Sequence, residues 1–177
     1  MDAADPAGKT GRGGTTMTRG WAMAEPQVRE LFRAAIASND AVAMRKGIEM
    51  LLGIGGADGL SAEREHQLRR PDFVMEMPQS GERVRGRDAM RRLQERFPVP
   101  GGPAVTLRRV VGGDRVWVAE ATADYGDDPW HVVVIFELDA TGLIARETRY
   151  YTQRLDAPQW RADLVEAMDE GVRADDS

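Results

Sequence analysis

Three residues in the last fifth of the chain have side chains and a spacing that suit acid/base chemistry. Glu147, Arg149 and Tyr151 stand two residues apart, so a β-strand would place all three on one face. A carboxylate can donate or accept a proton, a guanidinium can stabilise a developing oxyanion, and a tyrosine hydroxyl can donate a hydrogen bond. Charges in an apolar surrounding must pair or change protonation state. The pattern therefore indicates a reactive acid/base group or a structural ion-pair network, and both interpretations stay open.

The elements that would position these residues follow an α+β order. Apolar residues at helical spacing predict helices at 26–38, 40–52, 61–70 and 88–97. Strand patterns predict a short strand at 72–77 and long strands at 105–111, 115–125, 130–138 and 143–155. Turns rich in glycine and aspartate join the long strands. We expect a curved antiparallel sheet with helices across its concave face, which makes a cone whose open mouth suits a small molecule.

The composition predicts one globular domain. Of the 177 residues, 42% are hydrophobic and 30% are charged, and we place the domain at 23–170 between a disordered leader at 1–22 and a flexible acidic tail at 171–177. The absence of cysteine excludes disulfides, thiolate metal sites and cysteine nucleophiles, and it is compatible with a cytoplasmic location. A net charge of -5 without a basic stripe argues against nucleic acid, and no apolar run is long enough to span a membrane. Two histidines, His66 and His131, are too few for a metal site.

Two segments carry a resemblance to a known superfamily. Residues 72–90 read as strand, proline, hairpin and then Gly-Arg at the start of a helix, which resembles the SnoaL-like pattern. Residues 142–151 are similar to that family's Gly-Lys-Ile motif, which ends in tyrosine. Together they make residues 26–155 similar to the SnoaL-like branch of the NTF2-like superfamily. That superfamily includes polyketide cyclases, ketosteroid isomerases, limonene epoxide hydrolases and plain binding modules, so fold alone does not settle function.

The positions that carry chemistry in those relatives differ in this chain. The acidic residue that the cyclase and epoxide-hydrolase relatives place on the last strand is replaced by Arg149. Glu120 and Thr122 stand where the epoxide hydrolases have an Arg-x-Asp pair, and Glu76 stands where they have an asparagine. These departures argue against a direct transfer of either mechanism.

The register implied by the resemblance predicts the lining of the cone. The acid/base candidates are Glu76, Glu120, Glu147, Arg149 and Tyr151. The candidate ligand contacts are Val74, Val118, Thr122, Trp130, Val132 and Phe136. We expect Arg149 to neutralise Glu76 and Glu147, and at least one carboxylate to keep a raised pKa. A single β-bulge would move every later residue of a strand to the opposite face.

Two functions are compatible with this lining. The first is a cofactor-free cyclase, isomerase, hydratase or hydrolase that acts on a small apolar molecule, with no metal. The second is a non-catalytic binding or assembly domain. A homodimer is expected through the outer sheet face, where Trp117 and Tyr150 would otherwise be exposed. Trp160 follows the last strand, so we expect it either to close over the mouth as a lid or to anchor the core.

Overall fold

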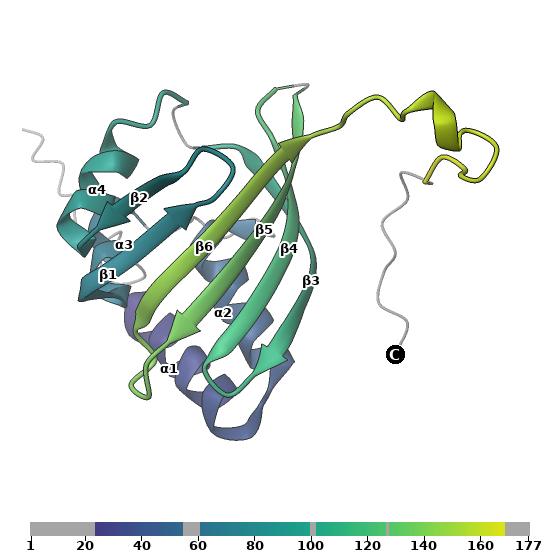
Figure 1. The fold of residues 1–177 in the computed structure, drawn as a ribbon. Helices are drawn as coiled ribbons and strands as arrows, with labels where there is room; N and C mark the ends of the chain where they lie inside the picture. Colours follow the sequence, from purple (N-terminus) through teal and green to yellow (C-terminus); the bar gives the residue numbers. More distant parts are fainter. Residues whose placement is uncertain (1–23, 55–60, 100–101, 127, 169–177) are drawn as a thin grey trace, which may run out of the picture.

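A layer of helices covers one face of a curved six-stranded sheet (Figure 1). The computed structural model describes residues 24–54, 61–99, 102–126 and 128–168. The predicted leader at 1–22 and the acidic tail at 171–177 lie outside the described residues. None of the described helices is long and apolar enough to cross a membrane.

Four α-helices form the covering layer within the described residues. They are α1 (Ala24–Ser38), α2 (Ala41–Leu52), α3 (Ala62–Leu68) and α4 (Arg87–Glu95). The predicted start of α2 is confirmed, because the Asp40 carboxylate accepts from the N–H groups of Val42 and Ala43. The helix ends at Gly53, whose φ of 70° is a left-handed conformation that glycine adopts without strain.

The sheet is mixed, where an antiparallel one was predicted. Its strands are β1 (Arg69–Met77), β2 (Glu82–Arg85), β3 (Ala104–Gly113), β4 (Val116–Asp124), β5 (Pro129–Leu138) and β6 (Ile144–Gln153). They are ordered β2-β1-β6-β5-β4-β3, and β1 runs parallel to β6 while every other neighbouring pair is antiparallel. The long connection through α4 and the meander from β3 to β5 returns the chain to β1 in the parallel sense.

The concave face is built from successive rungs that cross β4, β5 and β6. Three of them are Trp117–Phe136–Glu147, Ala119–Val134–Arg149 and Ala121–Val132–Tyr151. Trp117 was predicted on the outer face, and that prediction is wrong. Its side chain is fully buried in the core and its Nε1–H donates to the Asp114 carbonyl at 3.0 Å. The buried set of β4 is Trp117 with three alanines, whereas the outer set begins with two valines and continues with Glu120, Thr122 and Asp124.

The helices close the core from the other side. Phe32 of α1 and Ile48 of α2 are buried in the same cluster as Trp117. The two helices meet at Gly47, where an added Cβ would lie 2.7 Å from the Phe32 ring. A glycine at this position therefore allows the close approach of the two helices.

Candidate ligand site on the concave face

Strand β6 carries a line of polar side chains from the buried interior toward the open end of the cone. Glu147 has no exposed surface, the Arg149 side chain is 22% exposed, and Tyr151 is half-buried. Their alternation along the strand keeps all three on the concave face. The structure thus brings together Glu147, Arg149 and Tyr151, with the predicted contacts Trp130, Val132 and Phe136 on the same face.

Arg149 joins the other two members of the line. Its Nε–H donates to Glu147 Oε2 at 2.7 Å, and its Nη2 donates to the same oxygen. Its Nη1 donates to the Tyr151 hydroxyl at 3.4 Å. The guanidinium is therefore anchored from behind by a buried carboxylate and presents its other edge to the open end.

A second buried cation, Arg69, was not predicted from the sequence. It is 1% exposed, and its guanidinium donates to Glu65 Oε2 at 2.8 Å and to Gln94 Oε1 at 3.1 Å. Its Nε lies 3.6 Å from Glu147 Oε1, and neither atom makes a hydrogen bond. Its guanidinium also lies over the Phe73 ring, 5.3 Å from the centroid.

Local sequence contained one signal for this residue. Glu65 and Arg69 are four residues apart on what was expected to be one helix, which is the spacing of a helical ion pair. The contact of Arg69 with Glu147 is long-range in sequence, so no local pattern could reveal it.

The two arginines decide the charge state of Glu147. Burial by itself raises the pKa of this carboxyl, but the charges of Arg149 and Arg69 outweigh burial and hold the pKa below its ordinary value. Burial lowers the pKa of Arg149, while the Glu147 carboxylate more than offsets that effect and raises it. Glu147 is therefore ionised at neutral pH, which is the opposite of the raised carboxyl pKa expected for this cone.

Three aromatic side chains lie together where β4 ends and β5 begins. We call Phe97, Tyr125 and Trp130 the aromatic rim. The ring centroids of Phe97 and Tyr125 are 6.2 Å apart, and those of Tyr125 and Trp130 are 6.3 Å apart and nearly perpendicular. Burial raises the pKa of the Tyr125 hydroxyl, Tyr151 adds to the rise and Arg149 opposes it. The aromatic rim therefore lies within electrostatic range of the Arg149–Tyr151 pair.

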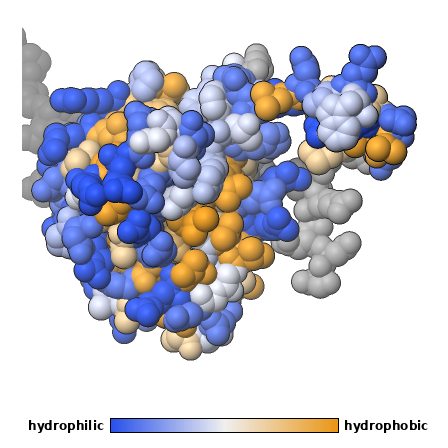
Figure 2. All heavy atoms as spheres, viewed as in Figure 1, coloured by the Kyte–Doolittle hydropathy of each residue, from blue (hydrophilic) through white to orange (hydrophobic). Residues whose placement is uncertain are grey.

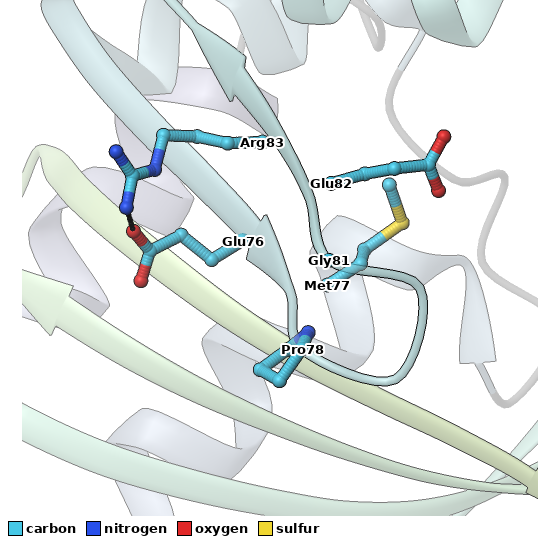
Figure 3. A pocket seen from close by; sticks show the side chains of 6 residues that line it. All are labelled: Glu76, Met77, Pro78, Gly81, Glu82 and Arg83. Carbon is cyan, nitrogen blue, oxygen red and sulfur yellow. Dashed lines mark ion pairs between the residues drawn. The ribbon is translucent and has the colours of Figure 1, made fainter.

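Glu76 lies on the opposite, convex face, and its predicted place inside the cone is wrong. Its carboxylate pairs with Arg83 at 2.5 Å and with Arg146 at 3.2 Å. It borders a surface depression at the hairpin of β1 and β2, whose lining residues Figure 3 shows: Glu76, Met77, Pro78, Gly81, Glu82 and Arg83. Arg149 therefore neutralises Glu147 but not Glu76.

The same correction applies to the other residues predicted from β1 and β4. Glu120 pairs on the convex face with Arg109 at 2.7 Å and with Arg108 at 3.4 Å. Three predicted ligand contacts share the alternating sets of Glu76 and Glu120 and lie on that face with them: Val74, Val118 and Thr122. The cause is an offset of one residue in the assumed register of both strands, which exchanges the two faces completely.

The two histidines lie apart from this site. His66 is buried between α3 and α4, where its Nε2 is 2.6 Å from the Asp88 carboxylate. His131 is exposed on the convex face opposite Thr122.

The chain resembles several solved structures, while no protein-family model and no curated protein matches it. One is an NTF2-like protein of unknown function from Burkholderia xenovorans, with 25% identity, a TM-score of 0.55, and coverage of 83% of this chain and 99% of that one. Another, from Kribbella flavida, has a provisional ketosteroid isomerase assignment, with 24% identity, a TM-score of 0.60 and coverage of 83% and 93%. A third is a steroid delta-isomerase from Pseudomonas aeruginosa, with 19% identity, a TM-score of 0.50 and coverage of 63% and 79%.

These structures share the arrangement described above, in which helices cover one face of a curved sheet. Sequence identities of a quarter or less show a shared fold, and the chemistry has to be inferred from the residues of the site. The resemblance predicted from residues 72–90 and 142–151 is confirmed at this level: the chain has the fold of the NTF2-like superfamily.

Proposed function

We propose that the concave face binds a small, largely apolar molecule through one of its oxygen atoms and activates that oxygen. The reaction class is cofactor-free acid/base chemistry of the cyclase, isomerase, hydratase or hydrolase type. The observation that carries the proposal is the position of Arg149, which is held by the fully buried Glu147 and is itself partly exposed. A cation fixed in this way is ready to stabilise negative charge that develops on a bound oxygen.

Arg149 and Tyr151 act on the ligand oxygen together. The Tyr151 oxygen accepts a hydrogen bond from Arg149, so its own O–H proton remains free to point toward the open end. Donation from a cation polarises the hydroxyl and makes it a stronger donor. The guanidinium and the hydroxyl would then donate to one oxygen, while Val132 and the aromatic rim contact the apolar body of the molecule.

Glu147 serves in this proposal as the counter-ion of Arg149. Among the described residues of β3, β4, β5 and β6, it is the one carboxylate on the concave face. Because its pKa is lowered, it carries no proton to donate at neutral pH. Its role is to fix the orientation of the guanidinium and to balance its charge.

A non-catalytic ligand-binding domain is the second candidate. The specific observation in its favour is that Glu147 contacts two guanidiniums, which makes this carboxylate a weak proton acceptor. Both candidates share the oxygen-binding pair, so one binding experiment tests their common part and a second separates them.

The binding experiment uses 4-nitrophenol, a flat apolar molecule whose phenolate absorbs visible light. Binding to Arg149 and Tyr151 should favour the phenolate, so the protein should shift its ionisation to lower pH. Arg149→Met should abolish the shift and Tyr151→Phe should reduce it. Arg146→Met is the matched control, because Arg146 lies on the same strand but pairs on the convex face. An unchanged shift in Arg149→Met would contradict the proposal.

The second experiment follows the exchange of hydrogen for deuterium next to the carbonyl of a small apolar ketone in D2O. Polarising the carbonyl acidifies the neighbouring C–H, so a base in the buffer removes its proton faster and deuterium from the solvent replaces it; loss of one donor typically costs ~10²–10³-fold. Acceleration that disappears in Tyr151→Phe supports the catalytic candidate. Phenolate binding without any acceleration supports the binding domain.

We also propose a homodimer through the convex face of the sheet. Figure 2 shows apolar side chains gathered over the middle of that face, with hydrophilic ones around them. Val111, Val116 and Tyr150 are each exposed by more than two-fifths. The neighbouring charges of both signs, such as Glu120 with Arg109, suit a two-fold contact between identical surfaces.

A further inference from the structure

The segment that follows β6 carries large apolar side chains that do not pack on the body of the protein. We call residues 154–168 the C-terminal arm. Five of its side chains are half or more exposed: Leu155, Trp160, Leu164, Val165 and Met168. Figure 1 shows the arm leaving one end of β6 and standing clear of the sheet, with a single 3₁₀ turn, Gln159–Arg161, in it. The interpretation of Trp160 as a core anchor is therefore wrong.

So many apolar residues in one exposed segment indicate a surface that the arm covers. Single exposed apolar side chains are ordinary, but a cluster marks an interaction site. The arm also carries charges that keep it in water when it is open, among them Arg161, whose guanidinium lies 5.9 Å from the centre of the Trp160 ring.

The arm begins at the open end of the cone. Gln153, the last residue of β6, pairs with Trp130 of the aromatic rim, so the arm starts about one strand spacing, ~4.8 Å, from the rim. Trp160 follows seven residues later and can reach at most ~25 Å from that point. Phe97 of the rim is 44% exposed and offers an apolar surface within this reach.

We propose that the C-terminal arm folds over the mouth of its own cone, with Trp160 and Leu164 packed on the aromatic rim. In that position Arg161 would lie beside Asp128, which is exposed at the turn between β4 and β5. The closed arm covers Arg149 and Tyr151 and removes water from them, so its opening controls access to the site.

We expect the aromatic rim to bind the arm of its own chain, because only residues 154–159 separate Trp160 from the end of β6. A short flexible linker gives its two ends an effective concentration in the millimolar range, far above the concentration of a second chain in solution. Two unpartnered apolar surfaces joined by residues 154–159 therefore meet each other before they meet another copy.

The test measures arm closure without any ligand, so its outcome is independent of the proposed chemistry. The chain has no cysteine, so Asp124→Cys with Ala162→Cys gives two unique positions for nitroxide labels on the full chain. We expect a population of short distances, below ~25 Å. Trp160→Ser should remove most of that population. Val42→Ser, which removes an exposed apolar side chain from α2, should leave it intact.

Three results would overturn the proposal. A distance distribution that is broad and unchanged by Trp160→Ser shows an open arm. A short distance that survives Trp160→Ser places the contact elsewhere on the arm. A mixture of chains labelled singly at 124 and at 162 that gives the short distance, with a population rising with protein concentration, shows exchange of arms between two copies.

Discussion

Replacing Arg149 by methionine should destabilise the protein by an amount that depends on pH. The change removes two hydrogen bonds to the fully buried Glu147 and leaves only Arg69, whose Nε is 3.6 Å away without a hydrogen bond. Breaking a buried ion pair by removing one partner costs about 3–5 kcal/mol. Because Arg69 still compensates part of the Glu147 charge, we expect the free energy of unfolding to fall by ~3 kcal/mol at pH 7.5.

The sign of the pH dependence follows from the pKa of Glu147. In the wild type this pKa is lowered on folding, so the carboxylate contributes stability above its unfolded pKa near ~4.3, and the contribution is lost as pH falls through the folded value. Without Arg149, less positive charge opposes the effect of burial, so the pKa of Glu147 in the folded protein rises. If it passes ~4.3, the variant loses stability as pH rises through that window. The difference between wild type and variant should therefore be larger at pH 7.5 than at pH 4.

Urea denaturation at the two pH values measures this difference, and an unchanged m-value would show that two-state unfolding holds. Arg146→Met is the control, since Arg146 is 41% exposed and pairs with Glu76 and Glu137 on the convex face. Its cost should stay within about 1 kcal/mol. If Arg149→Met behaves like Arg146→Met at both pH values, the buried pair does not hold the site as described.

Three further predictions concern the framework. Arg69→Met should lower the free energy of unfolding by ~3 kcal/mol, because it leaves Glu65 and Glu147 without the cation that they share. The neighbouring change Arg70→Met should lower it by less than ~1 kcal/mol, because Arg70 pairs only at the surface. Equal melting temperatures of the two variants would contradict this difference. Gly47→Ala should destabilise by more than ~1 kcal/mol although alanine favours helices, because the new Cβ would clash with Phe32; a stabilised variant would show that the helices separate freely. Tyr150→Arg should convert the proposed homodimer to monomer by light scattering, and a wild type that is already monomeric at micromolar concentration would remove that proposal.

Local patterns were sufficient for most of the secondary structure. The cap at Asp40 and the glycine at 53 define α2, and the predicted long strands lie close to β3–β6. It was harder to predict which face of each strand points toward the helices. On β6, one alternating set holds the only carboxylate of the strand, Glu147, in line with Arg149 and Tyr151, so this line was recognisable. On β4, the two valines of one set were taken to mark the inner face, but they share that set with Glu120, Thr122 and Asp124, and the buried set is Trp117 with three alanines.

Long-range contacts account for the rest of the site. Arg69 reaches Glu147 from the start of β1, across the one parallel pair of the sheet. That pair exists because the chain returns after a long connection, and no window of sequence contains both residues. The charge state of Glu147 depends on this contact, so the lowered pKa could not be predicted from β6 alone.

The most direct test of the proposed site is a crystal structure of the full chain with bound 4-nitrophenol. We expect the phenolate oxygen on the concave face, about 2.7–3.1 Å from the Arg149 guanidinium and the Tyr151 hydroxyl, with its ring against the aromatic rim. A phenolate bound instead at the depression beside Glu76 and Arg83, with the concave face empty, would contradict it.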